Sequence, residues 1–303
     1  MINSPRKIEA ELISEKDFER VAILVNKMTG ISLQSNKRTM VSGRLLKQIR
    51  KSGYASLEDY LVEVGDQNNK DVRETFISSL TTNMTRFQRE AHHFKHLATK
   101  VLPNLHENAK RGEKIRIWSA ACSSGEEIYD ISFQLWEVIP HPSSYDIKLL
   151  ATDIDTDILN FARRGEYHNS KTQQIPEPLL RKYLQTCEKG TDHKKIRTDL
   201  QDLIDFSRIN LNSNWKMPID FDVIFCRNAA IYFDEETQNK LWRRLVSKLK
   251  PGGVIYIGHS EALPDDLMKF VKTEDIGTFR RNQTPMSSDG EQTMWERKKG
   301  SNK

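Results

Sequence analysis

Residues 114–127, KIRIWSAACSSGEE, constrain the fold of this chain more than any other stretch. Their apolar, β-branched start at 115–118 is typical of a buried strand, and small residues, one glycine and two acids follow it. A run with helical character comes next. Strand, tight loop and helix start in this order are typical of a nucleotide or nucleoside site, because free N–H groups at the helix start face the ligand. The same pattern also fits an ordinary strand-to-helix turn, and the loop alone leaves both interpretations open.

The residues of this loop also indicate which ligand it could take. It holds one glycine where a dinucleotide fingerprint has three, and it lacks a Gly-Lys-Ser/Thr ending. Glu126 and Glu127 would repel a pyrophosphate, whereas two carboxylates can accept hydrogen bonds from an ammonium group. We therefore expect a nucleoside that carries an amino acid, and S-adenosylmethionine fits this description.

Strands and helices continue to alternate after this run. Further strands are predicted at 147–151, 222–226 and 254–258, with helical runs between them. This alternation favours a parallel-rich α/β sheet that binds its ligand at the carboxyl ends of the strands. Asp153, at the tip of the second strand, is placed to accept hydrogen bonds from both ribose hydroxyls, whereas Asp155 better suits the N-cap of the next helix.

The chain divides into segments of different character. Residues 1–82 show helical periodicity and helix-capping residues, and they predict an all-helical N-terminal domain. A linker and connecting helix are expected over 83–110, a Rossmann-like α/β domain over 111–285, and a disordered tail over 286–303. Within the α/β domain, strand-like runs at 196–200 and 203–207 predict an inserted β-subdomain over 166–209.

A basic stripe is expected on the second helix of the N-terminal domain. At ~100° per residue, one narrow sector holds Lys37, Arg44, Lys47 and Lys51, opposite the apolar side of the helix. Such a stripe is either a solvated face or a docking surface for an acidic partner, and the charge pattern does not decide between them.

Composition places the chain in a broad class. Its 303 residues fit about two domains, and no apolar run approaches the ~18 residues of a membrane span. Three widely spaced cysteines favour a reducing cytoplasm without disulfides or zinc, and His92 and His96 lack a third metal ligand. The net charge of +5 is too small to indicate nucleic acid as a partner.

Four segments together resemble the chemotaxis-receptor glutamate methyltransferases, the CheR family. They are TNMTRFQRE at 82–90, SAACSSGEE at 119–127, ATDID at 151–155 and FCRNAAIYFD at 225–234. The resemblance implies an all-α domain before a Rossmann-like S-adenosylmethionine-dependent methyltransferase domain with a small β-subdomain. It further implies methyl transfer to glutamate side chains of membrane chemoreceptors. The expected partner is their cytoplasmic helical region, and we expect a cytoplasmic monomer without membrane insertion.

The resemblance also assigns roles to residues. It implies a cofactor site of Asn83, Thr85, Arg89, Glu127, Asp153, Asn210, Leu211, Arg227 and Asn228. Arg89 and Tyr232 are expected to act in catalysis by orienting the substrate carboxylate, which is already ionised at neutral pH and needs no general base. Receptor docking is expected of the basic stripe.

The sequence departs from the usual family pattern at several positions. Gln88 stands where a second aromatic is usual, Ile128 replaces a proline, Asp130 replaces a serine, and Ala229-Ala230 replace larger apolar residues. These departures keep two alternatives open: a cofactor-binding module of the receptor array without catalysis, and a methyltransferase with another substrate.

Overall fold

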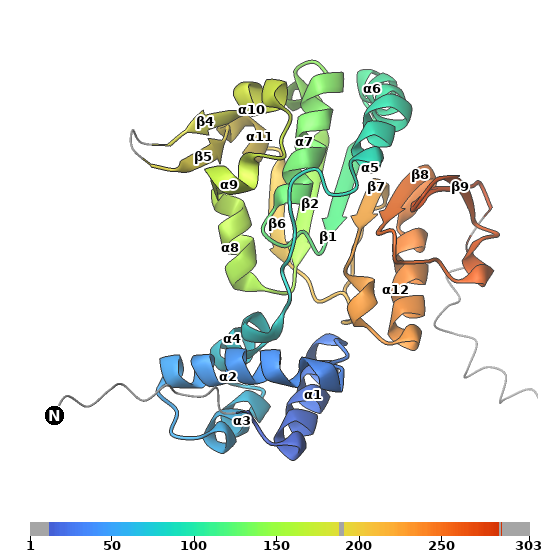
Figure 1. Ribbon diagram of the computed structural model, residues 1–303. Helices are drawn as coiled ribbons and strands as arrows, with labels where there is room; N and C mark the ends of the chain where they lie inside the picture. Colours follow the sequence, from blue (N-terminus) through green and yellow to red (C-terminus); the bar gives the residue numbers. More distant parts are fainter. Residues whose placement is uncertain (1–11, 188–190, 285, 287–303) are drawn as a thin grey trace, which may run out of the picture.

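The computed structural model describes residues 12–187, 191–284 and 286 (Figure 1). Four helices form the N-terminal domain, α1 (Glu15–Thr29), α2 (Arg38–Ser52), α3 (Leu57–Gly65) and α4 (Lys70–Leu80), with a short 3-10 turn, η1 (Ser35–Lys37), before α2. Ser14 and Ser56 cap two of these helices through their side chains, and Gly30 ends α1 in the left-handed region at φ 83°. The predicted all-helical domain is confirmed for the described residues.

A bent helical segment connects the two domains. It consists of α5 (Ala91–His96), a π-helical turn η2 (Leu97–Val101) and α6 (Leu102–Lys110). The side chains of Phe94, Leu97 and Leu102 are buried against the sheet domain. This packing anchors the segment to the second domain, while the preceding linker crosses toward the first (Figure 1).

A seven-stranded sheet forms the centre of the second domain, in the order β6-β2-β1-β7-β8-β10-β9. Its strands are β1 (Ile115–Ala120), β2 (Ile147–Asp153), β6 (Ile204–Arg208), β7 (Phe221–Cys226), β8 (Leu249–Ile257), β9 (Val271–Asp275) and β10 (Thr278–Arg281). The strands from β6 to β8 are parallel, and β10 and β9 complete the sheet as antiparallel strands. Because the chain runs from β1 to β2 on one side and places β7 on the other, a topological switch point lies between β1 and β7.

Helices cover both faces of this sheet (Figure 1). The main ones are α7 (Glu126–Val138), α8 (Thr156–Arg164) and α12 (Glu235–Ser247), and short 3-10 turns are η3 (Pro142–Ser144), η4 (Ala230–Tyr232) and η5 (Asp265–Leu267). Side chains alternate along β1, so that Ile117 packs into one hydrophobic core with α7, and Trp118 packs into the other with α12. This arrangement confirms the predicted Rossmann-like α/β class.

The inserted subdomain differs in part from the prediction. Its three-stranded antiparallel sheet has the order β3-β5-β4 and is built from β3 (Glu166–His168), β4 (Leu184–Thr186) and β5 (His193–Ile196), with α9 (Asn169–Thr172) and α10 (Glu177–Tyr183). The strand predicted at 196–200 is wrong, because Thr198–Gln201 forms the helix α11. The placement of 203–207 in the subdomain is also wrong, because β6 pairs with β2 in the main sheet. Of the tail predicted at 286–303, residues 287–303 lie outside the described residues.

Candidate active site

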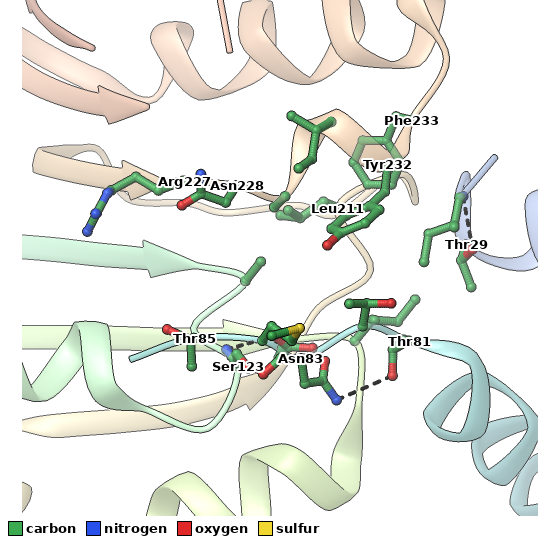
Figure 2. Close-up of a pocket in the computed structure, with 18 of the residues that line it drawn as sticks. Thr29, Thr81, Asn83, Thr85, Ser123, Leu211, Arg227, Asn228, Tyr232 and Phe233 are labelled. Atoms are coloured by element: carbon green, nitrogen blue, oxygen red, sulfur yellow. Dashed lines mark hydrogen bonds between the residues drawn. The ribbon is translucent and has the colours of Figure 1, made fainter. Parts of the chain in front are cut away.

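A cavity of about 650 Å³ lies where the carboxyl ends of the parallel strands meet the linker and the N-terminal domain. All residues predicted for the cofactor and for catalysis line it, namely Asn83, Thr85, Arg89, Glu127, Asp153, Asn210, Leu211, Arg227, Asn228 and Tyr232. In Figure 2, Asn83, Thr85 and Ser123 lie along one side, and Arg227, Asn228, Leu211 and Tyr232 lie along the other. Five segments that are far apart in sequence therefore converge on one space.

Asp153 lies at the end of β2 and is 7% exposed. Its two carboxylate oxygens accept the backbone N–H groups of Ser123, at 2.9 Å, and Asp155, at 3.0 Å. Burial raises the pKa of Asp153 to about 6. Each carboxylate oxygen has a second lone pair, so the group can still accept hydrogen bonds from hydroxyl groups of a ligand.

The two acids at the start of α7 have different environments. Glu127 lines the cavity, where it accepts a hydrogen bond from the Ser119 hydroxyl at 2.7 Å. Glu126 is fully buried away from the cavity and pairs with Lys171 at 3.1 Å. The expectation that both carboxylates face the ligand is therefore wrong for Glu126, because successive residues of a helix point about 100° apart.

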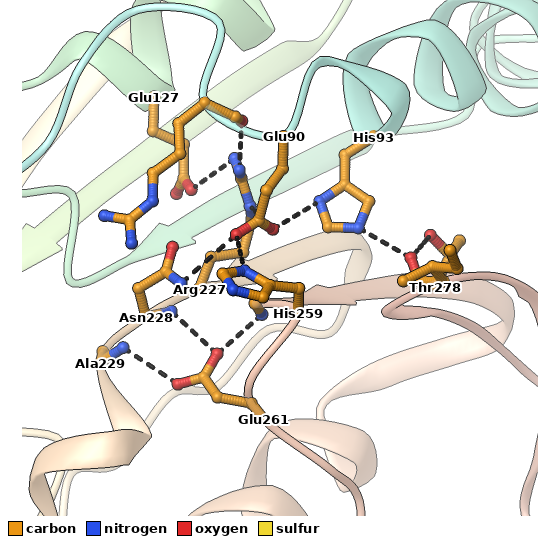
Figure 3. A network of polar contacts seen from close by, with 12 residues as sticks. Glu90, His93, Glu127, Arg227, Asn228, Ala229, His259, Glu261 and Thr278 are labelled. Carbon is orange, nitrogen blue, oxygen red and sulfur yellow. Dashed lines mark hydrogen bonds and ion pairs between the residues drawn. The ribbon is translucent and has the colours of Figure 1, made fainter.

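A buried ion network surrounds Arg227, whose side chain is 2% exposed (Figure 3). Its guanidinium contacts Glu127 at 3.2 Å and Glu90 at 3.4 Å, and it donates to the Arg89 carbonyl. Burial raises the pKa of Glu127 despite this contact. For Glu90, burial would raise the pKa, but His259, Arg227 and other donors outweigh it and lower the pKa to about 2.

Glu90 is not among the residues predicted for the site, although this acid directly follows the predicted Arg89. It is the shared acceptor of the network, since Asn228 Nδ2 at 3.3 Å and His259 Nδ1 at 3.0 Å also contact it. Its backbone adopts the left-handed region at φ 55°, as does Gln88 at φ 57°. These two conformations bend the linker sharply on either side of Arg89.

The linker is also held by hydrogen bonds between Gln88 and Asp130, two residues that depart from the usual family pattern. The backbone N–H of Gln88 donates to Asp130 Oδ2 at 2.7 Å, and its side-chain amide donates to Oδ1 at 2.6 Å. Asp130 is fully buried in α7, and burial raises its pKa to about 8 despite both hydrogen bonds. The polar side chain of Gln88 is thus paired with a buried carboxyl group of α7.

Two predicted cofactor residues use their side chains to connect segments of the chain. Asn83 donates to Asp155 Oδ2 at 2.7 Å, and Asp155 also caps α8 as predicted. Asn210 donates to the Met28 carbonyl at 2.8 Å, which joins the sheet domain to the end of α1. Both residues therefore hold the cavity together as well as lining it.

The N-terminal domain reaches the loop that carries Tyr232. The N–H of Ser32 donates to the Tyr232 carbonyl at 2.7 Å, and Ile31 forms an antiparallel bridge with Phe233. Tyr232 is half-buried, and within the described residues its hydroxyl has no protein hydrogen-bond partner. This phenol is therefore available to a ligand in the cavity.

The residues of the predicted basic stripe divide into two kinds. Lys37, Lys47 and Lys51 are exposed, and no carboxylate of the described chain lies within ion-pair distance of them. Arg44 is half-buried and donates to the Thr81 carbonyl at 2.7 Å, beyond the end of α4. Lys37 and Arg44 line the main cavity, and a second hollow of about 450 Å³ contains Arg44, Lys47 and Lys51.

Neither a membrane span nor a metal centre appears in the described part of the chain. Over residues 12–187, 191–284 and 286, no helix is long and apolar enough to cross a bilayer. The same residues contain no group of three or more His, Cys, Asp or Glu side chains able to hold a metal ion. His96 instead contacts the hydroxyl of Tyr256 at 3.0 Å.

The two domains match two family models. Residues 83–276 match the model described as CheR methyltransferase, SAM binding domain, and residues 16–81 match CheR methyltransferase, all-alpha domain. The fold, the cavity and these matches together define an S-adenosylmethionine-dependent methyltransferase.

Similar proteins extend over most of the chain. A Rhizobium etli protein named "Probable chemotaxis protein methyltransferase" is 41% identical over 83% of this chain and 94% of its own. The chemotaxis protein methyltransferases of Escherichia coli and Salmonella typhimurium are 38% and 37% identical, over 82% and 85% of this chain and 85% and 88% of theirs. The chain belongs to the CheR methyltransferase family of chemotaxis proteins.

Proposed function

We propose that this protein transfers a methyl group from S-adenosylmethionine to glutamate side chains on the cytoplasmic helical region of membrane chemoreceptors. The products would be glutamyl methyl esters that serve sensory adaptation in the cytoplasm. One observation carries the proposal: the linker, the strand ends and the loop after β7 meet in a cavity that is bordered by cations of the N-terminal domain.

The residues of the cavity fit the proposed cofactor. Its volume of about 650 Å³ falls within the range of ~300–1,000 Å³ that is common for small-molecule sites. Asp153 offers a carboxylate to ribose hydroxyls, and Glu127 offers one to an ammonium group. Ile154, Ile209 and Leu211 supply an apolar lining for a base. When bound, the cofactor would supply a methyl group activated by a positive sulfur.

Arg89 is the residue best suited to orient the substrate carboxylate. Arg227 is buried and forms ion pairs with Glu90 and Glu127, so its positive charge is already neutralised by the protein. Arg89 is half-buried on the cavity wall, and its Nη1 donates to the Met84 carbonyl at 3.1 Å. This contact holds the guanidinium and leaves its other N–H groups able to donate to a ligand. Arg89 would position the carboxylate rather than bind it tightly, since tight ground-state binding would slow the reaction.

Tyr232 would complete this orientation with one directional hydrogen bond. A carboxylate with an ordinary pKa of ~4.3 is ionised at neutral pH, so no residue has to remove a proton. Holding the nucleophile in line with the methyl group can lower the barrier by several kcal/mol. The hydrogen bond from the Ser32 N–H to the Tyr232 carbonyl ties the loop that carries Tyr232 to the N-terminal domain.

The proposed docking surface consists of Lys37, Arg44, Lys47 and Lys51. Lys47 and Lys51 line the hollow between α2 and α4 together with Ser78 and Ser79. This hollow shares Arg44 with the main cavity, so the cations extend from the site along α2. An acidic receptor helix lying on them would place one glutamate at the cavity.

The docking surface is tested by reversing two charges. Lys47→Glu with Lys51→Glu is preferred to a change at Arg44, because Arg44 also holds the end of α4. The pair should slow receptor methylation at low receptor concentration and reduce its dependence on salt, since charged surfaces steer association. Lys95→Glu with Lys100→Glu, exposed on the connecting helix, is the matched control. Equal rates and equal salt dependence in both variants would make the stripe a solvated face.

The proposed activity is tested by its product. The protein is incubated with S-adenosylmethionine labelled in the methyl group and with receptor-bearing membranes. Label released as methanol by mild base supports a glutamyl ester. Base-stable label would indicate a methyltransferase with another substrate, and cofactor binding without any label would indicate a non-catalytic module.

A further inference from the structure

The loop after β7 is held by contacts from outside the loop. It runs from Arg227 through the 3-10 turn η4 to Tyr232 and carries side chains on the cavity wall. Asn228 adopts the left-handed region at φ 58°, which is uncommon outside glycine, although asparagine tolerates it better than most residues. Of the two alanines that follow, Ala230 is fully buried in the hydrophobic core with α12, and Ala229 packs partly against that core.

One carboxylate, that of Glu261, accepts four backbone N–H groups around this loop (Figure 3). Its Oε2 accepts from Asn228 at 2.8 Å and from Gly258 at 2.7 Å. Its Oε1 accepts from Ala229 at 3.0 Å and from Ala230 at 2.8 Å. The negative charge thus lies at the N-terminal end of η4, where the N–H groups converge.

The segment after β8 approaches the loop closely enough to exclude a side chain. A Cβ atom at Gly258 would lie 2.5 Å from Asn228 Nδ2 and 2.8 Å from Glu261 Oε2. A Cβ atom there would also lie 2.9 Å from the Asn228 backbone nitrogen, so a side chain at position 258 would displace the carboxylate or the loop. Gly258 and Glu261 are not part of the wall of the main cavity.

We propose that Glu261 is a positioning residue for methyl transfer. Its carboxylate fixes the backbone at 228–230, and this backbone sets the directions of Arg227 and Tyr232 toward the cavity. The proposal rests on the proposed methyltransferase function for its kinetic consequence. The backbone contacts themselves do not depend on that function.

Removing the carboxylate and supplying a small one in solution tests the role. In Glu261→Ala, amide exchange of residues 228–230, followed by mass spectrometry, should become faster than in the wild type. The rate of methyl transfer at saturating receptor should fall by about 10- to 100-fold, because small misplacements of reacting groups have effects of this size. The affinity for S-adenosylhomocysteine should fall less than the turnover. Glu235→Ala, which removes an exposed carboxylate at the start of α12, is the matched control.

Acetate should then restore both properties of Glu261→Ala in a concentration-dependent way, while chloride at the same ionic strength should not. Normal turnover in a variant whose loop amides exchange faster would overturn the proposal. So would a loss of turnover that acetate fails to reverse although it restores amide protection. If the wild type itself transfers no label, the proposed function fails, and the exchange measurements still decide whether Glu261 holds the loop.

Discussion

The pairing of Gln88 with Asp130 leads to a quantitative prediction. In Gln88→Met, the side chain keeps its length and lacks β-branching, so it remains compatible with the left-handed backbone at φ 57°. The variant loses the amide that donates to Asp130 Oδ1 at 2.6 Å, but it keeps the backbone N–H bond to Oδ2. One hydrogen bond to a fully buried carboxyl group is therefore removed.

The structure sets the expected size of this effect. A buried acceptor left without its partner costs ~1–3 kcal/mol of unfolding free energy, so Gln88→Met should lose about 2 kcal/mol. Asp130→Ala should lose at least as much, because the side-chain amide and the backbone N–H of Gln88 are then both unpaired. The double variant leaves no side-chain group unsatisfied and shares with Asp130→Ala the loss of the backbone contact, so its loss should be smaller than the sum of the two single losses by ~1 kcal/mol or more.

Urea unfolding followed by circular dichroism measures all three variants at one pH. Gln185→Met, at an exposed position on β4, is the control and should change stability by no more than ~0.5 kcal/mol. If the losses from the two single variants add to within ~0.3–0.5 kcal/mol, the two residues are independent and the reasoning is refuted.

Three further predictions concern the site. Asp153→Ala should weaken S-adenosylhomocysteine binding by ~1–3 kcal/mol in calorimetric titration, and unchanged affinity would place the ribose contact elsewhere. Arg89→Ala and Tyr232→Phe should lower turnover more than cofactor affinity, and poor binding with normal turnover at saturation would contradict their roles. The Asp130 pKa of about 8, against ~3.9 when unfolded, means that the folded state binds more protons between these values. Unfolding free energy should therefore fall as pH rises through this window, and Asp130→Asn should flatten the slope in urea titrations.

Much of the fold follows from local patterns in the sequence. The helix ends at Ser14, Gly30 and Ser56 have side chains or conformations that specify a cap locally. The strand β1 has the β-branched apolar residues of a buried strand, and its small-residue loop indicates a close approach of a ligand. These features depend only on residues that are close together in the sequence, so local patterns are enough to predict them.

Features that depend on distant partners could not be predicted in this way. The run that forms β6 is apolar, but nothing in it specifies pairing with β2 instead of the small sheet. Gln88 and Asp130 are 42 residues apart, and Glu261 lies 33 residues from Asn228, so neither contact has a local signal. The different directions of Glu126 and Glu127 depend on the exact start of α7, where sequence patterns are least reliable.

Localising the transferred methyl group on the receptor tests the central claim most directly. Receptor-bearing membranes are incubated with S-adenosylmethionine and either the wild type or Arg89→Ala, and tryptic peptides are sequenced by tandem mass spectrometry. We expect methyl esters on glutamate side chains of the receptor's cytoplasmic helices, at much lower occupancy with the variant. Methyl groups on nitrogen or sulfur atoms, or on residues outside those helices, would contradict it.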